Sequence, residues 1–167
     1  INDGDTALGL RKEPMQRLSR WYYRGGRPNA VARILNRIGA IMNATGIAPN
    51  YMVTLEVVGR QSGKVISFPL VMTVMDGERD LVSMLGTEAN WVRNLQAAEG
   101  RAVLRHGETE PVRLGGSEPA LRPPILKAYL KHAPGARGHI PVDKDAPLAE
   151  FETVAAQIPV FQVRKDP

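Results

Sequence analysis

Alternating hydrophobic and polar positions dominate the middle of the chain. From residue 51 to 58 the side chains of Tyr51, Val53, Leu55 and Val57 alternate with their neighbours, a pattern typical of a strand with one buried face. The same type of pattern predicts five more strands, at 65–75, 80–85, 101–106, 108–114 and 159–164. Asp76-Gly77 is a strong hairpin signal between the second and third strands, and Gly107 separates the fourth from the fifth.

Helical spacing of apolar residues appears outside this region. A stripe from Val31 to Met42 predicts a helix that opens at Pro28 and ends at Gly46. Other helices are expected at 12–24, 88–98, 119–132 and 147–157, with a loop rich in Gly and Pro at 133–147. Thr87 is a candidate N-cap, and Pro123-Pro124 is expected to interrupt the fourth of these helices.

The order of these elements predicts an α+β fold. Strands and helices do not alternate regularly enough for a doubly wound sheet, so a mostly antiparallel six-stranded barrel with peripheral helices is expected. Pro69 cannot donate a ladder hydrogen bond, so it predicts a sheet edge or a bulge within 65–75. We expect one barrel domain over 27–167, preceded by a partly flexible basic segment at 1–26.

Composition narrows the possible functions. The 167 residues contain no cysteine, which excludes disulfides and thiolate chemistry, and the three histidines lack metal-ligand spacing. No apolar run reaches the roughly 18 residues that a membrane span needs. The lack of cysteine fits a cytoplasmic enzyme, which is the expected location. Aromatic residues make up only 5% of the chain and no recognition motif appears, so nucleic acid is not an expected partner.

Positive charge gathers near the N-terminus. The first fifty residues hold eight Arg or Lys against three acidic residues, with Arg17, Arg20, Arg24 and Arg27 close together. A solvated helical face explains such a cluster, and peripheral contact with a membrane surface is the sharper alternative.

Residues 59–64, Gly-Arg-Gln-Ser-Gly-Lys, lie between two predicted strands. A turn with two glycines, two cations and a hydroxyl can offer backbone N–H groups and charge to one small anion, as a phosphate site requires. An ordinary polar hairpin turn is the alternative interpretation. The strand end at 83–86 and the helix face that carries Trp91 and Asn94 add a flat apolar surface and an amide nearby.

Candidates for proton transfer lie later in the chain. His139 stands in the Gly/Pro loop that could act as a lid, and Tyr129 and His132 come just before it. No nucleophile–base pattern, paired-carboxylate motif or dinucleotide glycine fingerprint is present. A bound redox cofactor would need no protein nucleophile, because the cofactor carries the chemistry.

Taken together, Gly59–Lys64, Phe68-Pro69-Leu70 and the run from Asn90 to Leu95 followed by a Gly-Arg-Ala strand resemble the deazaflavin-dependent nitroreductase family of F420H2-dependent quinone reductases, found in mycobacteria and other actinobacteria. The resemblance covers roughly residues 30–165. It implies a split β-barrel of the FMN-binding-like type and binding of reduced coenzyme F420.

The resemblance also implies a set of cofactor-binding residues. The phosphate and the tail of F420 would be met by Arg60, Gln61, Ser62, Gly63 and Lys64. The deazaflavin would be lined by Ile66, Ser67, Phe68, Pro69, Leu70, Ser83, Met84, Leu85 and Gly86, and the site completed by Trp91, Arg93 and Asn94. Gln61 and Ile66 depart from the family's usual residues, which predicts a weaker phosphate site or greater reliance on Lys64 and the N-terminal arginines.

The expected function is therefore hydride transfer from F420H2 to a small electron acceptor, a quinone, an enone or a nitroaromatic. His139 and Tyr129 are the candidate catalytic side chains, and no metal is expected. Two alternatives stay open at this point: an oxidoreductase of the same fold that binds FMN, and a non-catalytic barrel that holds a cofactor or an apolar ligand.

Overall fold

The structure is a computed structural model that describes residues 51–167. The basic segment 1–26 and the helices predicted at 12–24 and 28–46 lie outside the described residues. Residues 51–167 contain the predicted barrel, so the loop at 59–64 and the later helices can all be placed.

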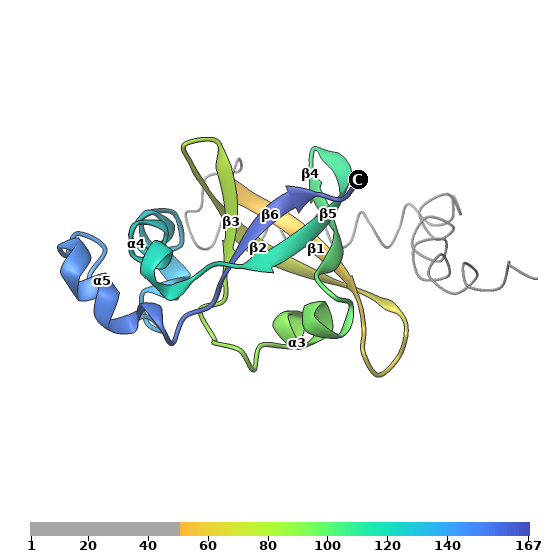
Figure 1. The fold of residues 1–167 in the computed structure, drawn as a ribbon, viewed down its shortest axis with the longest axis horizontal. Coiled ribbons are helices and arrows are strands. Elements are labelled where there is room, and N and C mark those ends of the chain that lie inside the picture. The colour runs from red at the N-terminus through yellow and green to blue at the C-terminus, as the bar shows by residue number, and fades with distance from the viewer. Residues whose placement is uncertain (1–50) are drawn as a thin grey trace, which may run out of the picture. The chain divides into compact units, whose positions relative to one another are not determined.

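Six antiparallel strands close into a barrel in the order β1-β2-β3-β6-β5-β4 (Figure 1), which confirms the predicted fold class. Their bounds are β1 Met52–Val58, β2 Val65–Met75, β3 Glu78–Val82, β4 Arg101–His106, β5 Glu108–Gly116 and β6 Val160–Lys165. Most strands match their predicted range within one or two residues. The exception is β3, which ends at Val82 because the side chain of Ser83 bonds to Gly86 O and starts a turn.

Three α-helices accompany the barrel: α3 Asn90–Ala97, α4 Arg122–His132 and α5 Leu148–Ala155. The short 3₁₀ segments η2 Pro119–Leu121 and η3 Pro134–Ala136 flank α4. Two predictions about helix ends were wrong. Thr87 does not cap α3, whose N-cap is Ala89, and Pro123-Pro124 does not interrupt α4 but lies in its first turn. Proline fits there because first-turn N–H groups have no intrahelical acceptor.

The buried residues form two clusters on opposite sides of the barrel wall. The inner cluster fills the barrel with side chains such as Leu55, Leu81 and Leu104, and α3 adds Val92 and Leu95 to it. The outer cluster lies between the barrel wall and helices α4 and α5, with Phe151 at 0% exposure. Each such side chain contributes about 1.5–3 kcal/mol on burial, so both clusters hold the fold together.

Strand β2 is paired on both sides over only part of its length. Its first half, Val65–Val71, pairs with β1, whereas its pairing with β3 begins at Met72. Among the described residues, the first half of β2 therefore has one edge without a strand partner, although the barrel as a whole is closed. Pro69 lies within that half, as its missing N–H donor predicted.

Candidate functional site

The loop between β1 and β2 is a closed turn that presents two cations. Gly59 N donates to Lys64 O at 2.7 Å and Gly63 N donates to Gly59 O at 2.8 Å, which fixes the ends of the loop together. The side chains from Arg60 to Lys64 are all exposed. The loop thus holds positive charge in water at the open half of β2, where an anion can reach it.

The two glycines of this loop fit tight positions. A Cβ on Gly59 would lie 2.8 Å from Ser62 Oγ and 3.2 Å from Lys64 O, so a side chain there would require its neighbours to shift. Gly63 has φ +64°, a left-handed conformation that glycine adopts without strain. The glycine spacing seen in the sequence therefore sets the loop's shape.

The loop is also tied to helix α3. The side-chain oxygen of Asn94, which is 2% exposed, accepts hydrogen bonds from Arg60 N at 3.3 Å and Arg60 Nη1 at 2.8 Å. A buried amide needs such partners, and here they orient the guanidinium of Arg60. The sequence placed both residues at the site but gave no sign that they contact each other.

The open half of β2 supplies the predicted lining of the deazaflavin. Phe68 and Leu70 are half-buried against the inner cluster, while Ile66 keeps 38% of its surface exposed. Ser67 and Pro69 lie on the other face of the strand, because successive strand residues alternate. Among the described residues these apolar side chains stay accessible on a strand that is paired on one side only, so they are suited to contact a flat ligand.

The turn that follows β3 is held by its own hydrogen bonds. Ser83 Oγ donates to Gly86 O at 2.7 Å, and Gly86 N donates to Ser83 O at 3.1 Å. The hydroxyl of Ser83 is therefore committed to the turn, whereas Leu85 is 59% exposed. Met84 packs against the outer cluster. This turn can offer Leu85 and backbone groups to a ligand.

Helix α3 places its predicted site residues in different surroundings. Trp91 is 6% exposed and its ring lies edge-on to Phe161 with centroids 5.2 Å apart, so it is part of the barrel core. Arg93 is exposed and pairs with Glu88 at 3.5 Å. Of the three predicted α3 residues, Asn94 is the one that touches the loop.

The two candidate proton donors differ sharply in exposure. Tyr129 on α4 is 5% exposed in the outer cluster, and its burial raises the pKa of the phenol to about 12. The hydroxyl therefore stays protonated at neutral pH and can donate a hydrogen bond. His139 is exposed at a turn, where its backbone N–H donates to Ala136 O at 2.9 Å. His132 stacks on Tyr51 at a centroid distance of 3.8 Å.

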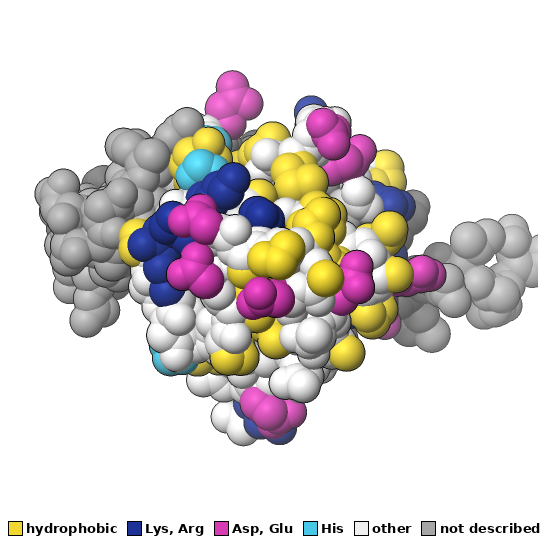
Figure 2. Space-filling view, turned by 90° about the vertical axis from the view of Figure 1, so that its left-hand side faces the viewer, with side chains coloured by type: hydrophobic (Ala, Val, Ile, Leu, Met, Phe, Trp, Pro, Cys, Tyr) yellow, Lys and Arg dark blue, Asp and Glu magenta, His cyan; other side chains and the backbone are white. Residues whose placement is uncertain are grey.

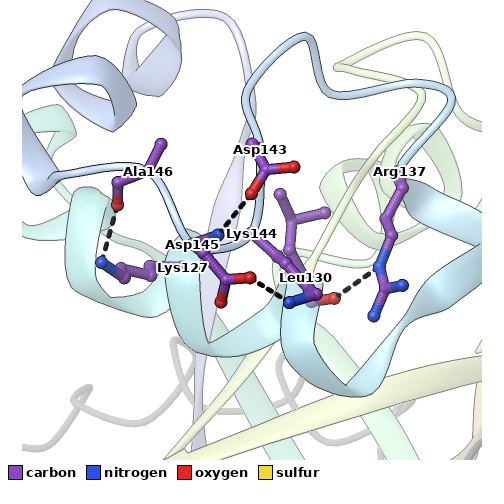
Figure 3. Close-up of polar contacts among 7 residues, drawn as sticks. All are labelled: Lys127, Leu130, Arg137, Asp143, Lys144, Asp145 and Ala146. Carbon is purple, nitrogen blue, oxygen red and sulfur yellow. Dashed lines mark hydrogen bonds and ion pairs between the residues drawn. The ribbon is translucent and has the colours of Figure 1, made fainter.

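The predicted lid loop is fastened to α4 (Figure 3). Arg137 Nε donates to Leu130 O at 3.2 Å, and Lys127 Nζ donates to Ala146 O at 2.6 Å. Ile140 is 1% exposed and anchors the middle of the loop. These contacts hold the loop against α4 in this conformation.

Helices α4 and α5 and the β1–β2 loop lie at opposite ends of the view in Figure 1. Strand β2 connects the two ends, because Val71 packs on the outer cluster that contains Tyr129. The structure thus brings Met84, Val71 and Tyr129 into one cluster and places Arg60, Lys64 and Asn94 in another. A ligand that contacts both groups must extend along β2.

A separate groove lies on the outer face of β3, β6 and β5. It has a volume of about 950 Å³ and its floor includes Asp80, Gln162 and Gly115. Burial first, and the nearby charge of Glu78 second, raise the pKa of Asp80 to about 6. This groove was not predicted from the sequence. The sequence feature that could have indicated it is Asp80, an acidic residue at the start of a strand that is otherwise apolar.

Two features are absent from the described part of the chain, a membrane-spanning helix and a cluster of metal ligands. Between residues 51 and 167, no helix is long and apolar enough to cross a membrane. In the same range, no three or more side chains of His, Cys, Asp or Glu gather as metal ligands would.

Comparison with solved structures gives the fold. A protein of unknown function from Agrobacterium tumefaciens has a TM-score of 0.50 and 12% identity over 77% of this chain and 55% of its own. A structure described as a domain-swapped dimer also has a TM-score of 0.50, with 18% identity over 81% of this chain and 100% of its own. This chain is a split β-barrel.

The similar structures also include one described as an F420-H2 dependent reductase. It is 22% identical over 68% of this chain and 94% of its own, with a TM-score of 0.47. No protein-family model and no curated protein matches the chain.

Proposed function

We propose that this split β-barrel is an F420H2-dependent reductase that transfers a hydride to a quinone, an enone or a nitroaromatic compound. The observation that carries the proposal is the Gly-bracketed loop, which holds the exposed cations Arg60 and Lys64 next to the open half of β2. The motifs that resemble the deazaflavin-dependent family include this loop. The function therefore rests on the motifs and on the geometry of the loop.

The residues of the loop fit an anionic group. Lys64 offers an ammonium with no hydrogen bond of its own in the described part of the chain, and Arg60 keeps guanidinium N–H groups beyond the one bonded to Asn94. Charge-assisted contacts to phosphate are among the stronger hydrogen bonds, at about 1.5–3 kcal/mol each. Arg60 and Lys64 would hold the phosphate and the acidic tail of F420.

The apolar part of the site suits a flat ring. Ile66, Phe68 and Leu70 present accessible apolar surface along β2, and Leu85 stands exposed on the turn after β3. These side chains would exclude water from one face of a bound deazaflavin, and the turn at 83–86 would limit its tilt. The bound deazaflavin supplies the hydride chemistry.

Reduction of the acceptor also requires a proton. The Tyr129 hydroxyl is protonated at neutral pH and lies in the cluster that Met84 joins, and the His139 imidazole is open to solvent. We propose that one of them donates the proton or a hydrogen bond to the acceptor oxygen. General acid assistance contributes about 10²–10⁴-fold, so Tyr129→Phe or His139→Gln should slow turnover by that factor and leave cofactor affinity intact.

The first experiment measures binding of F420 and of FMN by fluorescence. The wild-type chain should bind F420 more tightly than FMN, and Lys64→Ala should weaken F420 binding by about 10- to 100-fold. Lys131→Ala is the matched control, since it removes an exposed lysine from α4. Tighter binding of FMN would instead favour a flavin enzyme of the same fold, and equal F420 affinities for the two variants would move the site elsewhere.

A second experiment separates an enzyme from a cofactor carrier. Oxidation of F420H2 with menadione as acceptor is followed by the recovery of F420 fluorescence. Multiple turnovers per protein are expected. If F420 binds but menadione, an enone and a nitroaromatic all fail to reoxidise F420H2, the barrel binds the cofactor without acting as a reductase.

A further inference from the structure

The groove on the outer barrel face is lined by a carboxylate, that of Asp80, which has no partner among residues 51–167. Asp80 is 3% exposed and lines the groove, yet none of its hydrogen bonds or ion pairs appears among the described residues. Thr73 lies directly opposite Asp80 on β2, and its buried Oγ1 has no hydrogen-bond partner either. Unpaired buried polar groups cost free energy, so a ligand that donates hydrogen bonds here would offset that cost.

The neighbours of Asp80 are already engaged with other groups. Gln162 lies opposite Asp80 on β6, but its Nε2 donates to Glu78 Oε2 at 2.6 Å and its Oε1 accepts from Arg164 Nη2 at 2.6 Å. Next in the row is Gly115, where an added Cβ would meet nothing within 4 Å. The floor of the groove therefore has space above it and an acceptor that its neighbours leave free.

The charge of the groove is opposite to that of the whole chain. The chain carries a formal net charge of +5, whereas the groove is lined by six acidic and three basic side chains. Two of the basic groups have partners: Arg113 lies 3.7 Å from Asp166, and Arg164 bonds to Gln162. An electronegative groove on a basic protein favours a cationic ligand over an anionic one.

One wall of the groove is apolar. It is formed at the start of α4 by Pro124 and Ile125 and just before it by Leu121, which is 61% exposed. Figure 2 shows hydrophobic, acidic and basic side chains intermingled on the side of the molecule that carries α4 and α5. Pockets of several hundred Å³ with apolar walls and a few polar groups are typical of small-molecule sites.

We propose that this groove binds an organic cation, a protonated amine carried on an apolar body, with the ammonium group on the carboxylate of Asp80 and the body against Leu121 and Ile125. The site shares no residue with the β1–β2 loop. It is therefore a second site, and its occupancy does not depend on the cofactor proposed for the loop.

The test uses the full chain and a matched pair of probes, phenylbutylamine and the neutral phenylbutanol. The two differ only in the terminal group, so the difference in their dissociation constants, measured by calorimetry, isolates the ammonium. The amine is expected to bind at least about tenfold more tightly than the alcohol. Amide signals of Gly115 and Gly116 in NMR spectra should shift with the amine, which places it in the groove.

The decisive variant is Asp80→Asn, which keeps the shape of the side chain and removes its charge. It should weaken amine binding about 10- to 100-fold and leave alcohol binding unchanged. Glu118→Gln removes an exposed charge at the rim and should change amine binding by less than about threefold. Equal binding of amine and alcohol, full amine affinity in Asp80→Asn, or no binding of either probe would each overturn the proposal.

Discussion

The two ends of strand β2 carry opposite charge in opposite surroundings. At its start, Arg60 and Lys64 stand in water on a loop that hydrogen bonds hold in shape. Beyond its end, across the Asp76-Gly77 turn, β3 carries Asp80, whose carboxylate is buried. Exposed cations cost little to maintain because water solvates them, whereas a buried lone carboxylate pays a desolvation penalty that appears as a raised pKa.

This difference shows which kind of charge a sequence motif can reveal. The cations of the loop lie within six consecutive residues, so their grouping is visible in the chain itself. Asp80 becomes unusual only through Thr73, Gln162 and Gly115, which three other strands bring beside it. Substitutions, pH and salt concentration can test each end of β2 separately.

The largest effect on stability is expected at Trp91, a core residue on the helix that also holds the cationic loop through Asn94. Trp91→Ala removes a buried indole from the helix that carries Asn94, and should lower the free energy of unfolding by about 3–5 kcal/mol. Arg93→Ala, on the exposed side of the same helix, should change it by less than about 0.5 kcal/mol. Denaturant unfolding measures both. A stable Trp91→Ala protein that no longer binds F420 would instead make Trp91 a ligand contact.

At the acidic end, Asp80 should make the stability of the protein depend on pH. The folded protein holds the pKa of Asp80 at about 6, above its usual 3.8, so the folded state favours the protonated carboxyl. Stability from this group is present below pH 4 and is lost as pH rises through 6. Asp80→Asn cannot ionise, so its free energy of unfolding at pH 7.5 should be higher than that of the wild type by about 2–3 kcal/mol.

Thermal and urea unfolding of both proteins at pH 4.5 and pH 7.5 tests this prediction. The difference in unfolding free energy between Asp80→Asn and the wild type should grow with pH over this window. Glu118→Gln, an exposed control, should show no such trend. A difference that stays constant with pH would mean that Asp80 does not titrate in this range.

A smaller effect is expected at the contact between loop and helix. Asn94→Ala removes the acceptor of two hydrogen bonds from Arg60 and should cost about 1–2 kcal/mol of stability. It should also weaken F420 binding severalfold, because the guanidinium loses its orientation. Gln96→Ala, an exposed change on the same helix, should alter neither property. Unchanged F420 affinity in Asn94→Ala would show that the loop keeps its shape without the helix.

The smallest expected difference concerns salt. Exposed charges are screened at physiological ionic strength, where the Debye length is about 8 Å, and buried ones are screened less. Raising NaCl from low to physiological concentration should therefore weaken F420 binding at the loop more than amine binding at Asp80. Parallel titrations of the two ligands in each buffer measure this. An equal salt dependence would contradict the contrast between exposed and buried charge.

Much of the barrel could be predicted from the chain because its determinants are local. Alternation identified the strands, and Asp76-Gly77 and Gly107 adopt the positive φ values that their hairpin turns require. The errors were at ends of elements, where single side-chain hydrogen bonds and proline geometry decide and hydrophobic periodicity does not. Ser83 leaves β3 because its hydroxyl reaches Gly86 O, and Pro123 starts a helix turn because that position needs no N–H donor.

The sequence by itself determined the six strands, the turns between them and the cationic loop at 59–64, because each depends on residues that are neighbours in the chain. Tertiary structure alone decided that Asn94 accepts from Arg60, that Trp91 packs on Phe161 and that Asp80 is buried. These facts depend on strands and helices far apart in the chain meeting when the barrel closes. Burial and partnering are properties of that closure, and no local pattern encodes them.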